Sequence, residues 1–232
     1  MDLIFQFLRI MVFCFAGELC YNFLPLPIPA SVYGLLLLLA ALVLTAHNLR
    51  EARQAEHFSG ETAAKLTEEI SRRRTAREAE PEPQSEAPPE AEAESTDYLG
   101  LLELPTLSLT LPVAAEWSYP ALKRTPCRYS GTAGEVSFVI IAHNYPAHFG
   151  RLWELEPGAE VYFTDMDGMR WTYEVSYVEN LQPTQIEEMT EKTEESDEWD
   201  LTLFTCTTGG SARCAVRCVR TGYPALTTET AE

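Results

Sequence analysis

The sequence predicts an all-β domain, a closed or nearly closed barrel, which follows an apolar N-terminal region and an acidic linker. Three observations lead to this fold class. From residue 97 onward, short apolar runs alternate with turn signals, which is typical of a barrel. Residues 1–47 are overwhelmingly apolar, and residues 78–95 are rich in Pro, Glu and Ala. A chain of 232 residues therefore holds one globular domain plus these extra segments.

The apolar N-terminal region, residues 1–47, is predicted to be a membrane anchor. Its main span is residues 24–46, which carry no charge and are about as long as a helix that crosses a bilayer. Residues 3–23 are a candidate first span, but they include Arg9 and Glu18, so an interfacial helix is the alternative. A cleaved signal peptide fits less well, because the apolar region is too long and has no small-x-small site near its end.

Residues 48–96 are predicted to separate the anchor from the barrel. Residues 48–77 are charged and have helix-forming composition, so we expect a solvated juxtamembrane helix. Residues 78–95 have too few large apolar side chains to form a core, and their glutamate carboxylates repel one another. We therefore expect a disordered, extended acidic linker.

The barrel domain is assigned to residues 97–222, followed by a tail of residues 223–232. The Asp-Met-Asp-Gly sequence at 165–168 predicts a hairpin between two strands. The acidic stretch 187–200 reads as a loop or a short helix before the last two strands. Strands are expected at residues 98–104, 107–113, 136–142, 160–164, 170–178, 201–206 and 212–220.

Composition excludes some functions. The formal net charge of −18 argues against nucleic-acid binding, because phosphate backbones attract basic surfaces. Cys127, Cys214 and Cys218 have no Cys-x-x-Cys spacing, so we expect small buried residues and no structural zinc. We expect no cofactor. Calcium is the one candidate, at the acidic residues 187–198, although a solvated acidic loop is the favoured interpretation.

Three residues at the predicted strand ends have the chemistry of a cysteine protease or transpeptidase. Cys206 ends the run 201–206 at an open rim and supplies a thiol nucleophile. His143 ends another apolar run and supplies a proton donor for a leaving amine. Arg213 opens the strand after the Gly-Gly loop, and its guanidinium can hold a developing oxyanion. Arg217 lies on the same strand face but farther from the loop, so it ranks second.

These residues resemble the signature of the sortase family. The signature appears as Thr202-Leu-Phe-Thr-Cys206, Ala142-His143-Asn144 and Ala212-Arg213-Cys214. The resemblance covers residues 98–220 and includes Phe149-Gly-Arg-Leu152, although the loop between Cys206 and Arg213 is short for the family. It implies an eight-stranded β-barrel with short helices. It also implies that Cys206, His143 and Arg213 are catalytic, and that Asn144 and Thr205 contact the substrate.

The resemblance also implies a function. Cys206 would cleave Leu-Pro-x-Thr-Gly-like sorting signals of surface proteins and form a thioacyl intermediate. An amine of a peptidoglycan precursor or a pilin would then resolve the intermediate. A cysteine peptidase that uses water as the acceptor is an alternative. Such an enzyme would lie in the cell membrane, among its lipids, with the catalytic domain outside the cell.

A second resemblance concerns the N-terminal segment. Pro27-Ile-Pro-Ala-Ser-Val-Tyr-Gly34, followed by a leucine-rich run, is similar to the start of the holin-like murein-hydrolase regulators. The resemblance covers about the first 45 residues. It leaves open a holin-like membrane protein in which the barrel binds a wall component without catalysis.

Overall fold

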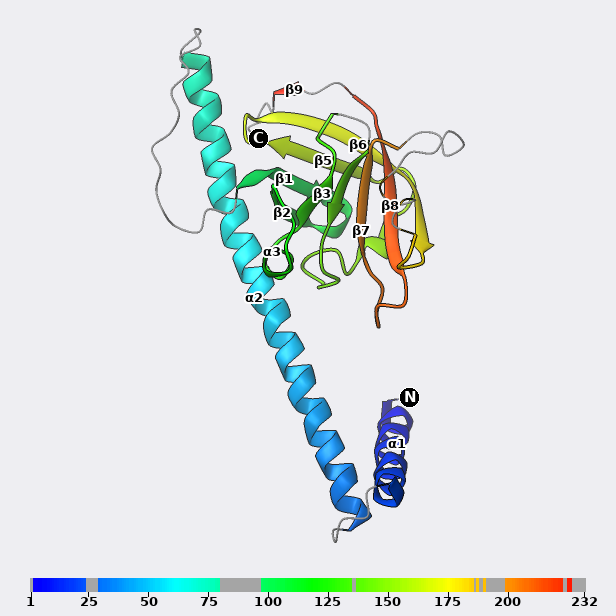
Figure 1. Ribbon diagram of the computed structural model, residues 1–232. Coiled ribbons are helices and arrows are strands. Elements are labelled where there is room, and N and C mark those ends of the chain that lie inside the picture. The colour runs from blue at the N-terminus through cyan, green and yellow to red at the C-terminus, as the bar shows by residue number, and fades with distance from the viewer. Residues whose placement is uncertain are drawn as a thin grey trace. The chain divides into compact units, whose positions relative to one another are not determined.

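The computed structural model describes residues 2–23, 29–79, 97–134, 137–185, 187, 190, 199–222 and 225–226 (Figure 1). The chain divides into two compact units, residues 1–51 and residues 52–232. We call them the anchor unit and the barrel unit, and each is described by itself. The predicted linker, residues 78–95, lies almost entirely outside the described residues.

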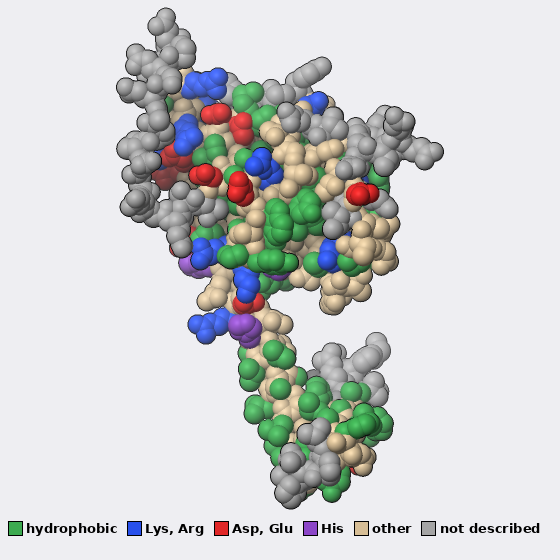
Figure 2. Space-filling model, viewed as in Figure 1, with side chains coloured by type: hydrophobic (Ala, Val, Ile, Leu, Met, Phe, Trp, Pro, Cys, Tyr) green, Lys and Arg blue, Asp and Glu red, His purple; other side chains and the backbone are tan. Residues whose placement is uncertain are grey.

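The anchor unit contains helix α1, Asp2–Phe23, and the first part of helix α2, Ala30–Ala79. The two helices pack closely at Gly34, where a Cβ atom would lie 3.2 Å from the carbonyl oxygen of Phe13. The rings of Tyr21 and Tyr33 meet edge to face, with centroids 6.3 Å apart. Figure 2 shows many hydrophobic side chains on the visible face of this unit.

Within the described residues, one helix is long and apolar enough to cross a membrane, and it lies in the stretch Ser31–Arg77. The shorter apolar stretch Met11–Phe23 belongs to α1. Leu39, Leu42 and Leu44 are more than half exposed, as apolar side chains that face lipid would be. The helix predicted over residues 48–77 forms, and it is continuous with the apolar span, because no Pro interrupts residues 30–79.

The barrel unit begins on the second part of α2, where one face of the helix is buried. These buried residues recur every three or four positions and therefore share a face. They are Ala55, Ser59, Ala63, Leu66 and Ile70. Ala63, Leu66 and Ile70 pack with Leu101 of the barrel, so the predicted solvated helix is wrong on this face. The predicted domain boundary at residue 97 therefore leaves out an element that packs against the barrel.

Eight strands close into the predicted barrel. Their spatial order is β5-β1-β2-β3-β4-β7-β8-β6, and pairing of β5 with β6 closes it. The strands are β1 Tyr98–Leu104, β2 Leu109–Ala114, β3 Cys127–Ser130, β4 Phe138–Ile141, β5 Glu160–Asp165, β6 Met169–Leu181, β7 Leu201–Cys206 and β8 Arg213–Arg220. A ninth strand, β9 (Ala225–Leu226), pairs with β6, so part of the predicted tail belongs to the sheet.

Short elements complete the barrel unit. They are the helix α3, Tyr119–Leu122, and the 3-10 turns η1, Pro105–Leu107, and η2, Leu152–Glu154. The predicted hairpin forms between β5 and β6: the carboxylate of Asp165 accepts from the backbone N–H groups of Asp167 and Met169, and Gly168 takes a φ of 82°. Most of the acidic stretch 187–200 lies outside the described residues.

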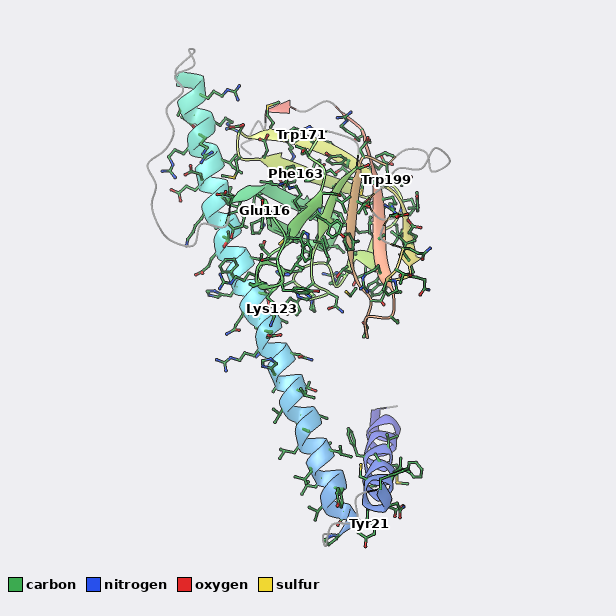
Figure 3. All side chains as sticks on the ribbon, in the orientation of Figure 1. Tyr21, Glu116, Lys123, Phe163, Trp171 and Trp199 are labelled. Carbon is green, nitrogen blue, oxygen red and sulfur yellow. The ribbon has the colours of Figure 1, made fainter. Side chains whose placement is uncertain are left out.

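The barrel interior is apolar. Phe138 and Phe163 meet edge to face with centroids 5.1 Å apart, and Trp171 lies 6.1 Å from Phe163 (Figure 3). Cys214 and Cys218 belong to this core, as predicted. Burial raises the pKa of both thiols above their ordinary value, and it raises that of Cys127 to about 11.

Candidate active site

Cys206 lies at the end of β7, on the outer face of the barrel. Leu201 and Leu203 of the same strand belong to the interior core, whereas Phe204 belongs to a separate apolar cluster. Because side chains alternate along a strand, Phe204 and Cys206 share the outer face. Cys206 is half-buried, whereas Cys127, Cys214 and Cys218 are buried. Among these four cysteines of the barrel unit, Cys206 is therefore the accessible thiol.

Arg213 lies directly opposite Cys206 on the neighbouring antiparallel strand β8. Residues paired in this way project to the same face, with Cβ atoms about 5 Å apart. The half-buried guanidinium donates through Nη1 to the carbonyl oxygens of Gly210 and Ala212, at 3.2 and 3.1 Å. These contacts hold the arginine beside the β7–β8 loop.

His143 follows the end of β4, which runs parallel to β7. Ile141 pairs with Phe204, and the Ala142 N–H donates to the Phe204 carbonyl at 3.3 Å. Continuing this register places the half-buried His143 level with Cys206. The backbone therefore brings His143, Cys206 and Arg213 to one end of three adjacent strands.

The two residues expected to contact substrate have different environments. Thr205 is buried, and its hydroxyl donates to the Ala142 carbonyl oxygen at 2.8 Å. This bond ties the end of β7 to the end of β4, so the structure gives Thr205 a role in holding the site together. Asn144 is exposed beside His143. Substrate contact by either residue stays a prediction.

A tight loop joins Cys206 to Arg213. The Thr207 N–H and hydroxyl both donate to the Ala212 carbonyl, at 3.0 and 3.1 Å, and the Ala212 N–H donates back to that hydroxyl. Gly209 and Gly210 have φ values of 85° and 73°, which favour glycine. The short loop thus closes without covering the thiol by a long insertion.

An apolar cluster covers the outer face beyond Cys206. Trp199 lies beside β7 and β8 in Figure 3 and is buried with Phe204. Tyr129 of β3 meets Phe204 edge to face at 5.5 Å, and the exposed Trp117 stacks on Tyr129 at 5.9 Å. A cavity of about 290 Å³ adjoins these rings; it is lined by Ala115, Glu116, Trp117, Arg128, Tyr129, Ser130 and Gly131.

Arg217, the second-ranked arginine, is buried within this outer face. It donates to the Glu179 carboxylate at 2.8 Å and to the Thr202 hydroxyl at 2.9 Å. Its guanidinium also lies 4.5 Å from the centre of the Trp199 ring. These contacts occupy Arg217 within the protein and agree with its lower rank.

His148, five residues after His143, is fully buried. Burial and the nearby His143 lower its pKa to about 4, against a smaller opposing effect of the Ala55 backbone. Its Nε2 lies 2.8 Å from Ser59 Oγ on α2. The sequence gives no signal for this contact, because the two residues are 89 positions apart.

No group of three or more His, Cys, Asp or Glu side chains that could hold a metal ion occurs among the described residues. The acidic residues 187–198, on which the calcium expectation depends, lie mostly outside this part of the chain. The expectation of no cofactor, with calcium as a candidate, therefore stays a prediction.

The chain was compared with known families. A model of the sortase domain matches residues 102–221, more than half of the chain. The chain belongs to the sortase family. A second model, that of the LrgA family, matches residues 14–61, where the sequence resembles holin-like regulators.

A solved sortase shares the fold. Sortase D5 of Clostridium perfringens is 16% identical with a TM-score of 0.53, covering 72% of this chain and 99% of that one. Sortase C1 of Streptococcus suis is 28% identical with a TM-score of 0.48, covering 55% of this chain and 75% of that one. No curated protein matches the chain. Family membership makes this sortase a cysteine transpeptidase at the level of reaction class.

Proposed function

We propose that this sortase cleaves Leu-Pro-x-Thr-Gly-like sorting signals of surface proteins and transfers them to an amine. One observation carries the assignment of the site: the strand register brings His143, Cys206 and Arg213 level with one another at the barrel rim. Each residue supplies one of the groups that acyl transfer requires, namely an acid–base, a nucleophile and a cation.

The reaction divides into two acyl transfers. The Cys206 thiolate attacks the carbonyl carbon between the Thr and Gly of the signal, and Arg213 stabilises the oxyanion that forms. His143 delivers a proton to the departing glycine amine, which leaves a thioester on Cys206. An incoming amine then attacks the thioester, His143 accepts its proton, and the thiolate leaves as the new amide bond forms.

The acceptor is an amine of a peptidoglycan precursor or of a pilin, and the barrel unit works outside the cell. Support for a membrane location comes from the apolar helix of the anchor unit and from the LrgA-like segment. The same segment favours a second candidate, a holin-like membrane protein without catalysis. The arrangement of Cys206, His143 and Arg213 supports the enzyme instead. A protein that only binds a wall component does not require a nucleophile, an acid and a cation at one rim of the barrel.

The test uses the full chain in detergent with a Leu-Pro-x-Thr-Gly peptide and an amine acceptor. We expect ligated product, a thioester on Cys206 detectable by mass spectrometry, and loss of both in Cys206→Ala. Cys14→Ala is the matched control, because Cys14 is an exposed cysteine of the anchor unit. Calcium chelation is expected to leave the rate unchanged.

The outcomes separate the candidates. Neither cleavage nor thioester would defeat both enzyme hypotheses and leave the holin-like one. Cleavage that continues at the same rate without ligated product, whatever the amine concentration, would identify a peptidase that uses water.

A further inference from the structure

A buried contact joins helix α2 to the loop that follows His143. Ser59 of α2 is 2% exposed, and its hydroxyl lies 2.8 Å from His148 Nε2 and 2.8 Å from the Arg124 carbonyl oxygen. All three residues belong to the barrel unit. Arg124 also lies over the ring of Phe58, the residue before Ser59, at 5.6 Å. The contact is therefore part of the docking of α2 on the barrel.

The bonding fixes the state of the His148 imidazole. A serine hydroxyl has one hydrogen, and the carbonyl oxygen of Arg124 can only accept it. Ser59 Oγ must then accept from His148, so the proton of the neutral ring is on Nε2. A charged ring would also protonate Nδ1, which is buried and has no hydrogen-bond partner among the described residues. The site thus selects one neutral tautomer and one ring orientation.

From His148 the contact extends to His143 through Tyr145. The Tyr145 ring lies 5.6 Å from the His148 ring and 5.1 Å from the His143 ring, measured between centroids. The backbone ties the same residues together: the His148 N–H donates to the Tyr145 carbonyl at 2.9 Å, and the Phe149 N–H donates to the His143 carbonyl at 3.2 Å. The fully buried Phe149 anchors this loop in the barrel core.

The loop has little room to adopt another path. A Cβ atom at Gly150 would lie 2.5 Å from the Asn144 carbonyl oxygen, so the chain returns closely past the residue after His143. A displacement of His148 therefore cannot be absorbed locally, and it reaches the Tyr145 ring and the backbone of His143.

We propose that Ser59 and His148 are positioning residues for His143, so that helix α2, which continues from the anchor unit, completes the active site. The inference rests on the proposed catalytic role of His143. Ser59 and His148 touch neither substrate nor the reacting atoms. They act by holding Tyr145 and the backbone on which the catalytic imidazole is carried.

The test compares Ser59→Ala, His148→Gln and Ser71→Ala in the full chain in detergent. Gln keeps an N–H near the position of Nε2 but removes the ring that contacts Tyr145, and Ser71 is an exposed serine on the same helix. Histidine-selective labelling gives only four ring signals, because the chain has four histidines. These are assigned by single substitutions and recorded beside steady-state kinetics.

We expect the His143 signal to move in Ser59→Ala and His148→Gln, with His47 and His57 unmoved and no change in Ser71→Ala. The kcat should fall about 10- to 100-fold with little change in KM, since misplacement of a catalytic group acts on the chemical step. An unmoved His143 signal in both variants, or a fall in kcat no larger than that of Ser71→Ala, would overturn the proposal. If the wild type is inactive while the His143 signal still moves, the proposed function fails and the positioning contact stands.

Discussion

At the scale of single residues, two arginines on one strand face have different environments. Arg213 is half-buried at the rim, and its guanidinium donates to carbonyl oxygens of the adjacent loop. Arg217 is 2% exposed and bonded to Glu179 and Thr202. An arginine at the rim can contact a substrate, whereas the buried arginine forms its hydrogen bonds with other side chains of the protein. Substitution of Arg213 should therefore lower the catalytic rate, and substitution of Arg217 should lower the stability of the fold.

We predict that Arg213→Ala lowers kcat by at least about 100-fold while the free energy of unfolding changes by less than about 1 kcal/mol. Arg217→Ala should instead lower the free energy of unfolding by about 2 kcal/mol, because it removes a buried side chain that packs on Trp199 and bonds to the Thr202 hydroxyl. Urea unfolding and peptide ligation measure the two effects. A stable, inactive Arg217→Ala protein beside an active Arg213→Ala protein would reverse the assignment.

His148 predicts a dependence of stability on pH. Its pKa falls from an ordinary value of 6.5 to about 4 on folding, so the unfolded chain binds the proton more readily than the folded one. The contribution of the neutral His148 ring to the free energy of unfolding is fully present above pH 6.5. It is lost as the pH falls toward 4. The expected slope is about 1.4 kcal/mol per pH unit in that window.

Urea unfolding of the wild type and of His148→Gln, at intervals between pH 7.5 and pH 4, checks this expectation. The carboxylates titrate in both proteins, so the difference between them isolates the histidine. The free energy of the wild type should fall more steeply than that of the variant. Parallel curves would show that His148 does not titrate in this range.

At the scale of elements, one face of α2, which includes Ala63, Leu66 and Ile70, docks on the barrel. Ala63 is 7% exposed and packs with Leu101 of β1, whereas its neighbour Ala64 is exposed. A larger or charged side chain at position 63 would therefore have to enter this packed contact.

We predict that Ala63→Glu undocks this part of α2, because a carboxylate there would be buried without a partner at a cost of roughly 2 kcal/mol or more. Ala64→Glu is the matched control and should change stability by less than about 0.5 kcal/mol. Hydrogen exchange should show faster exchange over residues 52–79 in the first variant alone. Equal protection in both variants would contradict the docking.

The elements that the sequence predicted well are those with strong local patterns. The bounds of β1 and β7 match the predicted strands, and the Asp-Met-Asp-Gly hairpin forms, because alternation and turn residues act locally. The four-residue β3 is too short to show a pattern. The docked face of α2 was missed because Leu66 and Ile70 lie within a charged stretch, and its other buried residues are Ala and Ser, which give little hydropathy signal.

The candidate site also contains residues that local sequence patterns predict and residues that they do not predict. His143, Cys206 and Arg213 lie in short motifs at strand ends, so local pattern and family resemblance sufficed to select them. Trp199 follows an acidic run and gave no comparable signal before its burial on the outer face was seen. The pairing of Ser59 with His148 depends on tertiary structure alone, since neither residue lies in a motif with the other.

At the scale of the whole molecule, the remaining question is on which side of the membrane the barrel unit lies. Arg50 and Arg53 follow the apolar part of α2, and the positive-inside rule would hold that end in the cytoplasm. The rule applies to short loops, however, and long domains cross largely regardless of their charge. The segment after the span is a folded unit of residues 52–232, so the rule does not decide its location.

We predict that the barrel unit lies outside the cell, where sorting signals and wall amines meet. A protease added to intact cells should then remove the barrel unit and leave a membrane-bound fragment, because residues 78–95 are rich in Pro, Glu and Ala, which favours an accessible linker, and residues 48–53 carry two arginines. A cytoplasmic protein that survives the treatment shows that the cells stayed closed, and the same digestion after lysis shows that the barrel unit is cleavable. Full protection in intact cells and cleavage after lysis would place the unit in the cytoplasm and remove its access to the wall.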